Sequence, residues 1–420
     1  MNNTILSSIF VGIDVDSTYN VVHIMDFTQK DLNCFKVKND LNGVVAIKDK
    51  ILEQFKNDNY KNLIVVLEST SVYAFHTATF LSSNDELLIY NPKVYCINPK
   101  ISCNYRASFA DTNKDDFTDA KLLADLARVG RCEQMTPWKG TQLLALQRLT
   151  RHRKHLSDMV ASEKNYVLNN IFLKFSGLCT ASSSDSPFSD IYGVTSSAII
   201  TEYLSPEDII NSSVEDLVKF ISDKSNNKFK NLEETIKLLK QCAVNSYRLD
   251  KVNLLPINLA ISSSMNCIQS LEKEINIVSQ KIGSLVKGLN QEEYTSLISI
   301  KGIGPVFAAG IIAEIGSIDQ FPNDDSLAKY AGITWRKKQS GKFEAEDNPL
   351  TKTGNKYLRY YFIEAANQVR KYVPEFNTYY NKKYNEAKTH KQMRAQVLTA
   401  RKLIKVVYAL LSTRSLYKSR

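Results

Sequence analysis

Two apolar segments of this chain each end on an acidic residue, and this pattern constrains the fold most. The run "FVGID" extends from Phe10 to Asp14, and "NLIVVLE" extends from Asn62 to Glu68. Short apolar runs rich in β-branched residues and bounded by polar turn segments indicate buried β-strands. A carboxylate at the end of a buried strand is costly unless another group compensates its charge. The pattern therefore predicts a sheet whose strand ends carry acids that need a compensating partner.

The neighbouring segments predict the rest of an α/β domain. Residues 20–26 and 32–38 alternate roughly between apolar and polar positions, which indicates hairpin partners for the first strand. Helical spacing follows in residues 40–57, and residues 93–99 form a third short strand that ends at a proline. The segment "DDFTDAKLLADLARVG", residues 115–130, predicts a helix with an acidic first turn and a glycine just past its end. This order of elements indicates an α/β domain with a mixed sheet.

Long helices and a second compact domain are expected after it. Residues 143–175 and 262–289 carry apolar residues at steps of three and four, which fits either core helices or a coiled-coil stalk. Residues 177–230 are rich in Ser and Asn and predict loops or an insertion. We divide the chain into an α/β domain at 1–135, a helical stalk with an insertion at 136–294, and a C-terminal domain at 295–420.

The C-terminal domain begins with a glycine-containing turn. The stretch "LISIKGIGPVFAAGIIAEIG", residues 297–316, places "GIGP" between two apolar helical segments, the pattern of a helix-hairpin-helix. Glycines let backbone N–H groups approach a phosphate, and a helix N-terminus adds partial positive charge. Lys301, Gly302 and Gly304 are therefore candidate nucleic-acid contacts. A plain turn between two core helices is the alternative.

Positive charge is concentrated at the end of the chain. Residues 331–420 contain 20 Lys and Arg against 6 Asp and Glu, whereas residues 1–330 carry a net charge of about −4. A basic segment interleaved with tyrosines indicates a polyanion partner, for which nucleic acid is the default, although a solvated basic surface is the alternative. No apolar run reaches the roughly 18 residues that cross a bilayer, and the N-terminus lacks a signal-peptide pattern. We therefore expect a cytoplasmic protein without a membrane partner.

Four acids form the candidate catalytic centre: Asp14, Glu68, Asp116 and Asp119. The last two are three residues apart, so a helix would turn both to one face. Converging carboxylates repel one another, and a divalent cation removes that cost. Hard oxygen ligands suit Mg²⁺, with Mn²⁺ possible, and two ions about 3.5–4 Å apart would support phosphoryl transfer. Taken singly, each acid also has a structural explanation as a turn cap, a lysine partner or a helix start.

Asp16 and Asp115 lie beside these acids and have to be told apart from them. If the first strand persists through Asp16, then Asp14 and Asp16 share one face. If the chain turns at Val15, Asp16 points to solvent.

A late serine is the other candidate for chemistry. Ser340 precedes a glycine in a basic loop, where a serine is either a nucleophile activated by a base or metal, or a bystander in a phosphate-binding loop. The helix that follows is basic and aromatic, and its cations could hold backbone phosphates. The candidate phosphate contacts in the two segments are Arg336, Lys337, Lys338 and Lys342 in the loop and Lys352, Lys356 and Arg359 after it.

These motifs together resemble the DEDD transposases of the Piv/MooV type, the insertion-sequence family one-ten. The front carries "FVGIDVDST", "VVLESTSVY" and "KDDFTDAKLLADLA", and the rear carries "LISIKGIGPVFAAGIIAEIG", "LAKYAGITWRKKQSGK" and "KTGNKYLRYYFIEAA", in the family's order. The resemblance covers residues 8–130 and 295–375. Asp115 stands where the family usually has Thr, Ser71 stands where Gly is common, and residues 177–260 are longer than a plain stalk needs.

The resemblance implies a RuvC-like, ribonuclease-H-type domain, a helical coiled-coil stalk and a small helical transposase domain. It carries the metal-binding acids onto Asp14, Glu68, Asp116 and Asp119, and the essential serine, which attacks DNA to form a phosphoserine link, onto Ser340. It also implies guidance by a structured (bridge) RNA, and dimers that pair into tetramers with composite sites. The expected function is a DNA transposase or site-specific recombinase of a mobile insertion sequence, associated with the nucleoid.

Other functions remain as alternatives. A RuvC-like, structure-selective endonuclease would use the acids for hydrolysis alone and would not need Ser340. The segment "GIDVDST" also resembles the first phosphate loop of sugar kinases and actin-like ATPases, but the later Asp-x-Gly-Gly-type loop of those proteins is missing from the sequence. A noncatalytic nucleic-acid binder would leave the four acids unexplained.

Overall fold

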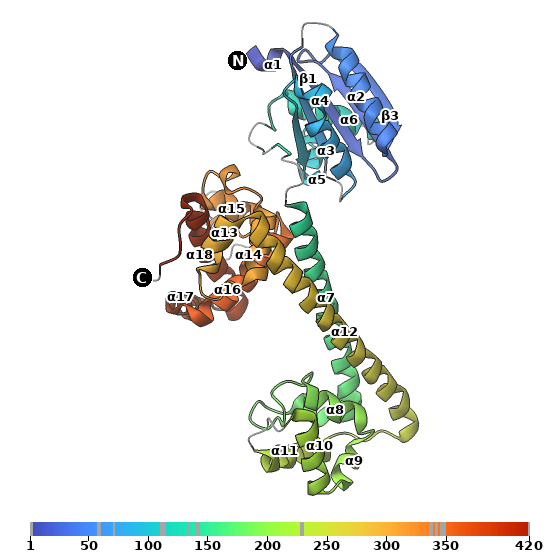
Figure 1. Ribbon diagram of the computed structural model, residues 1–420, viewed down its shortest axis with the longest axis vertical. Helices are drawn as coiled ribbons and strands as arrows, with labels where there is room; N and C mark the ends of the chain where they lie inside the picture. Colours follow the sequence, from blue (N-terminus) through green and yellow to red (C-terminus); the bar gives the residue numbers. More distant parts are fainter. Residues whose placement is uncertain are drawn as a thin grey trace. The chain divides into compact units, whose positions relative to one another are not determined.

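The computed structural model describes residues 3–56, 60–69, 72–109, 115–132, 135, 137–138, 143–226, 231–335, 339–340, 343–344 and 350–418, with the backbone alone at 3–4, 339–340 and 343–344. The chain divides into two compact units, Met1–Gln142 and Leu143–Arg420 (Figure 1). Among the described residues, no helix is both long enough and apolar enough to span a membrane.

The first unit contains a five-stranded mixed sheet in the order β3-β2-β1-β4-β5. The central strand β1 pairs antiparallel with β2 and parallel with β4, so the predicted mixed sheet is confirmed. β1 and β4 are almost continuously apolar because helices cover both faces of the sheet. The strands are β1 (Ser8–Val15), β2 (Tyr19–Met25), β3 (Asp31–Lys38), β4 (Asn62–Glu68) and β5 (Lys93–Ile97).

Helices pack on both faces of this sheet. Ile9 and Val11 of β1 face one core, which they share with the helix after β3 and the helix after β4. Phe10 points to the other face of the sheet, where the last helix of the unit covers a second core. The sheet is therefore the middle of three layers, and α6 packs on its second face. The helices are α1 (Asn3–Leu6), α2 (Leu41–Phe55), α3 (Ala74–Ser83), α4 (Asp85–Leu88), α5 (Pro99–Arg106) and α6 (Asp116–Arg128).

A pair of long antiparallel helices runs through the second unit (Figure 1). They are α7 (Leu144–Thr180) and α12 (Lys251–Leu289). An ion pair of 2.9 Å joins Lys164 to Glu272, and Arg153 donates a 2.9 Å hydrogen bond from Nε to Ser279 Oγ. The predicted long helices are thus present, and they pack against each other along most of their length.

The segment between these helices folds into further helices around its own core. Ile199, Leu217 and Leu239 are buried there against α7 and α12. Of the two alternatives for residues 177–230, loops or an insertion, loops are wrong for residues 194–225, which are mostly helical, and a helical insertion fits them. Ser205, Ser213 and Asn231 serve here as helix N-caps. The helices are α8 (Val194–Glu202), α9 (Pro206–Asn211), α10 (Val214–Ser225) and α11 (Leu232–Val244).

The C-terminal part of this unit is a compact helical body. Tyr361, Phe362 and Leu403 are among its fully buried residues, and the start of α7 contributes Leu146 to the same core. Its elements are α13 (Gln291–Ile298), α14 (Pro305–Ile315), the 3₁₀ helix η1 (Ile318–Gln320), α15 (Asp324–Ala331), β6 (Gln339–Ser340), β7 (Phe343–Glu344), α16 (Lys356–Tyr372), α17 (Pro374–Glu386) and α18 (Lys391–Thr413).

The "GIGP" turn connects α13 and α14, as the sequence pattern indicates. Gly302 has a φ of +101°, and a Cβ placed on it would lie 2.8 Å from the Cα of Val369 in α16. This position therefore requires glycine both for its backbone conformation and for close packing of the turn on α16. Phosphate binding by the turn stays a prediction.

Candidate active site

The parallel pairing of β1 and β4 brings the first two predicted acids to the same edge of the sheet. Ile13 pairs with Leu67, so Asp14 and Glu68 follow at the same level near the carboxyl ends of the two strands. Both side chains are half-buried. Carboxyl ends of neighbouring parallel strands are where α/β sheets commonly hold their ligands.

Helix α6 carries the other two acids to the same region. Asp116 is its first residue and is exposed, and Asp119 lies one turn further and is half-buried. The helix lies directly on β1, because a Cβ placed on Gly12 would be only 2.0 Å from the carbonyl oxygen of Ala120. A glycine two residues before Asp14 thus contacts the residue after Asp119, which positions the acidic end of α6 beside the end of β1.

The pKa of the Asp14 carboxyl reflects the proximity of two of the other acids. Its pKa is raised to about 6, chiefly by burial and then by the negative charges of Glu68 and Asp116. The positive charge of Arg106 opposes that rise. Three of the four predicted acids therefore interact at one edge of the sheet, where Arg106 lies near Asp14 and Lys36 lies 3.8 Å from Asp116.

Asp119 is held differently. It forms an ion pair with Arg106, the last residue of α5, and both side chains are half-buried. From the same helix, Ser102 donates a 2.5 Å hydrogen bond from Oγ to Glu68 Oε2. Sequence reasoning missed both residues, because α5 carries no pattern that marks it, and only the tertiary packing of α5 on α6 reveals their place.

The two neighbouring acids have local structural roles. β1 ends at Val15, and Asp16 lies exposed in the following turn, where its Oδ1 accepts the N–H of Thr18 at 3.0 Å. Asp115 is the N-cap of α6 and accepts the N–H of Thr118 at 2.9 Å. Of the two orientations considered for Asp16, the one toward solvent is found.

The acids suit a hard divalent cation in charge and in donor chemistry. Asp14, Glu68 and Asp116 offer carboxylate oxygens from two strands and a helix, and the pKa of Asp14 is raised first by burial and then by the negative charges of Glu68 and Asp116. Within the described part of the chain, no group of three or more His, Cys, Asp or Glu side chains has the spacing of a formed metal site. In this arrangement Asp119 is bound to Arg106, and it would add its oxygens once that ion pair opens.

The raised pKa predicts how stability of the metal-free protein depends on pH. The ordinary pKa of the Asp14 carboxyl is 3.8, whereas the folded value is about 6, so the folded state binds this proton more tightly. The charged form therefore destabilises the fold above about pH 6, and this destabilisation disappears as the pH falls toward 4. In urea denaturation with EDTA, Asp14→Asn should be more stable than wild type at pH 7.5, and the difference should shrink through pH 6. A difference that is constant from pH 7.5 to pH 4 would contradict the assignment.

The serine segment lies in the second unit. Ser340 is the last residue of β6 and pairs with Phe343 of β7, and Trp335 pairs with Leu350 where the segment begins and ends. The side chain of Ser340 and the whole of residues Arg336, Lys337, Lys338 and Lys342 lie outside the described residues. Their predicted roles stay predictions.

The remaining predicted phosphate contacts differ in exposure. Lys301, Lys352 and Lys356 are exposed. Arg359 is half-buried, and its Nη1 donates hydrogen bonds to the carbonyl oxygens of Ala331, at 3.2 Å, and Lys352, at 3.1 Å. Arg359 thus holds the backbone before and after the serine segment together.

Comparison with protein-family models gives two matches. A model of DEDD transposases of IS110 elements, described as "Transposase", matches residues 11–174, a range that includes all four predicted acids. A model described as "Transposase IS116/IS110/IS902 family" matches residues 294–381, which include Ser340. Together the two models match more than half of the chain.

Curated proteins give similar results. A 44.8 kDa protein of insertion element IS116 from Streptomyces clavuligerus is 22% identical over 97% of this chain and 96% of its own length. A 43.6 kDa protein of insertion element IS110 from Streptomyces coelicolor is 33% identical over 30% of each chain. A probable family 20 transposase from Pseudomonas aeruginosa is 29% identical over 24% of this chain and 29% of its own length.

Proposed function

Because the chain belongs to the IS110 family of transposases, enzymes that cleave and rejoin DNA, we propose that it mobilises an insertion element by metal-dependent strand cleavage followed by strand exchange through Ser340. The observation that carries the proposal is that the parallel β1–β4 register and the close packing of α6 on Gly12 bring Asp14, Glu68 and Asp116 to one edge of the sheet. The activity would take place in the cytoplasm, at the nucleoid DNA.

The proposed roles of the acids follow from their positions. Asp14 and Glu68 would hold Mg²⁺ from the two strand ends, Asp116 from the first turn of α6, and Asp119 after release from Arg106. When bound, the ion would supply Lewis-acid stabilisation of the phosphate charge. Ser102 orients one oxygen of Glu68, so the other oxygen is available for binding.

The proposed nucleophile is the hydroxyl of Ser340. Its oxygen would form a bond to phosphorus as the bond from phosphorus to the leaving 3′ or 5′ oxygen breaks, and the serine proton would pass to a base or water. A second DNA hydroxyl would then attack the phosphoserine and restore the serine. The high density of Lys and Arg after residue 331 supports binding of nucleic acid around this segment.

We further propose that a structured RNA from the noncoding end of the element guides the protein, and that dimers pair into tetramers so that acids and serine of different subunits form one composite site. This proposal rests on the family resemblance and on the excess positive charge of the C-terminal part. RNA binding that depends on such charge should weaken steeply as salt rises.

A strand-exchange assay tests the serine. Purified protein, element-end DNA, target DNA and the transcribed noncoding RNA are combined, and joined product and covalent protein–DNA adduct are measured. The Ser340→Ala variant should form no covalent adduct, because the alanine side chain has no nucleophile. Its rate of strand joining should fall at least about a thousandfold.

The matched control is Ser412→Ala, a substitution of an exposed serine in α18, which should join strands at the wild-type rate. Omission of the RNA should also abolish joining. Wild-type joining by Ser340→Ala would contradict the serine nucleophile, whereas DNA cleavage without any joined product by the wild-type protein would favour an endonuclease that uses the acids for hydrolysis alone.

A further inference from the structure

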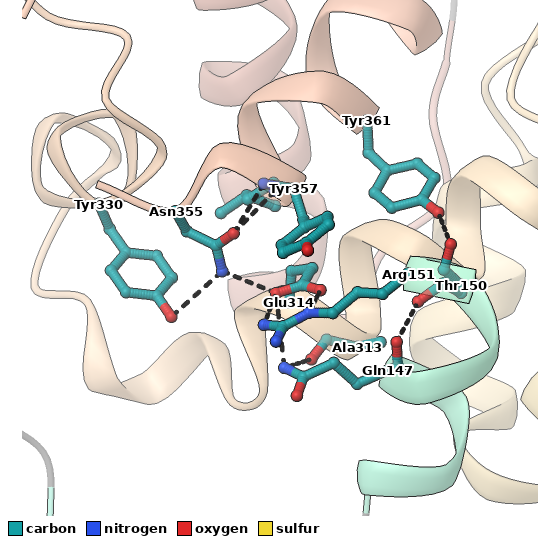
Figure 2. Close-up of polar contacts among 10 residues, drawn as sticks. Gln147, Thr150, Arg151, Ala313, Glu314, Tyr330, Asn355, Tyr357 and Tyr361 are labelled. Atoms are coloured by element: carbon teal, nitrogen blue, oxygen red, sulfur yellow. Dashed lines mark hydrogen bonds and ion pairs between the residues drawn. The ribbon is translucent and has the colours of Figure 1, made fainter. Parts of the chain in front are cut away.

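A buried carboxylate in the C-terminal body has partners on two other segments of the chain. Glu314 belongs to the apolar helix α14, and its side chain is fully buried. Arg151 of α7 binds it with two hydrogen bonds, Nε to Oε1 at 2.7 Å and Nη2 to Oε2 at 2.9 Å. Asn355 donates to Oε2 from Nδ2 at 2.7 Å (Figure 2). One charged group therefore joins α7, α14 and the start of α16.

Asn355 connects this ion pair to the backbone of α16. Its Oδ1 caps the helix by accepting the N–H groups of Tyr357, at 3.0 Å, and Leu358, at 3.1 Å. Its own N–H donates to the carbonyl oxygen of Tyr330 at 2.7 Å. The side chain of Asn355 is thus fixed from both ends, so its position depends on Glu314 and its position sets the start of α16.

The same residues lie at the base of the serine segment. The N–H of Thr351 donates to the carbonyl oxygen of Thr334 at 2.8 Å, next to the pairing of Trp335 with Leu350. Gly354 has a φ of +138°, and a Cβ placed there would lie 2.3 Å from the carbonyl oxygen of Tyr330. The chain entering the segment and the chain leaving it are therefore held together, with little room to shift.

A buried ion pair is a poor source of stability, because desolvation of the charges offsets most of their attraction. Its advantage is geometry: the two parallel hydrogen bonds between a guanidinium and a carboxylate fix both distance and orientation. A packed apolar pair would serve stability as well or better, but it would not orient Asn355.

We propose that Arg151, Glu314 and Asn355 form a positioning relay that sets the base of the Ser340 segment relative to α7, the first helix after the unit that carries the acids. The relay rests on the proposed role of Ser340. None of its members contacts DNA in this proposal; each acts through the next, from α7 to α14, to the N-cap of α16 and to the Trp335–Leu350 pair.

The test separates positioning from stability by replacing the ion pair with apolar residues. In the full chain, Glu314→Gln should lower thermal stability, because it leaves the Arg151 charge without its counter-ion. The double variant Glu314→Leu with Arg151→Met should recover wild-type stability or exceed it. Both variants should exchange the amide hydrogens of Thr351 and Asn355 about tenfold faster than wild type, and both should join strands about tenfold more slowly with unchanged DNA binding.

Glu272→Gln is the control, because it breaks an ion pair of the stalk that has no connection to the serine segment, and it should leave both measurements unchanged. A double variant with wild-type amide exchange at Thr351 and Asn355 would overturn the relay. The two proposals can fail separately. Amide exchange at Thr351 and Asn355 tests the relay, whereas normal strand joining by Ser340→Ala would overturn the role of Ser340 as nucleophile.

Discussion

Asp14→Asn is expected to lower the rate of DNA cleavage at least about a thousandfold while leaving the fold intact. The carboxylate of Asp14 is the group on which the charges of Glu68 and Asp116 act, so its loss removes the central oxygen ligand of the proposed metal site. A thousandfold loss corresponds to about 4 kcal/mol of transition-state stabilisation, a magnitude in the range of metal-ion catalysis. Single-turnover cleavage of labelled element-end DNA in saturating Mg²⁺ measures it.

Asp16→Asn is the matched control for this variant. Asp16 is the neighbouring acid, exposed in the turn after β1, and an asparagine there keeps the oxygen that accepts the N–H of Thr18. Its cleavage rate should stay within about twofold of wild type, as for most surface substitutions. Equal losses for Asp14→Asn and Asp16→Asn would remove the distinction between ligand and turn residue.

Gly12→Ala should destabilise the first unit and abolish cleavage although it changes no acid. The added methyl group would lie 2.0 Å from the oxygen of Ala120 and 2.4 Å from the nitrogen of Ala124. Both are backbone atoms of α6 and cannot rotate away, so the helix has to move off the sheet. That movement opens the core around Leu123 and carries Asp116 and Asp119 away from Asp14.

The expected size follows from overpacking, which at its upper end costs about 3 kcal/mol and would lower the Tm of a unit of this size by roughly 10 °C. Differential scanning calorimetry and the cleavage assay measure the two effects. Gly288→Ala is the control, because no described atom lies within 4 Å of the added methyl group, and an alanine in the α12 helix should raise stability slightly. A Gly12→Ala protein with wild-type Tm and cleavage would refute the close packing of α6 on β1.

The sequence was sufficient to predict the mixed sheet and the acids at two of its strand ends and in the first turn of α6. The ends of β1 and β4 could be predicted because both strands are short, apolar and followed by polar residues. The sequence left open whether the two strands pair parallel or antiparallel, and the structure shows the parallel pairing that brings their acids to one edge. The first turn of α6 was marked by Asp116 and Asp119, and its end by Gly130 just past the last helical residue. These signals are local, so they can be recognised without knowledge of the tertiary structure.

Other features depended on contacts between distant segments and could not be predicted. Arg106 binds Asp119 only because α5 packs on α6, and no spacing marks an arginine for that role. Glu314 is the one charged residue of the apolar helix α14, and its partner Arg151 is 163 residues away in the chain. The Ser and Asn residues of the segment between α7 and α12 suggested loops, because these residue types are common both in loops and at helix caps. Composition alone does not distinguish the two.

The most direct test of whether the strand ends and α6 form one metal site is the affinity for Mn²⁺, measured by isothermal titration calorimetry at pH 7.5. Wild type is compared with the variants Asp14→Asn, Glu68→Gln and Asp116→Asn. Each of the three substitutions should weaken binding at least about tenfold, since ligands of one site share the ion. Unchanged Mn²⁺ affinity in all three variants would contradict a shared site.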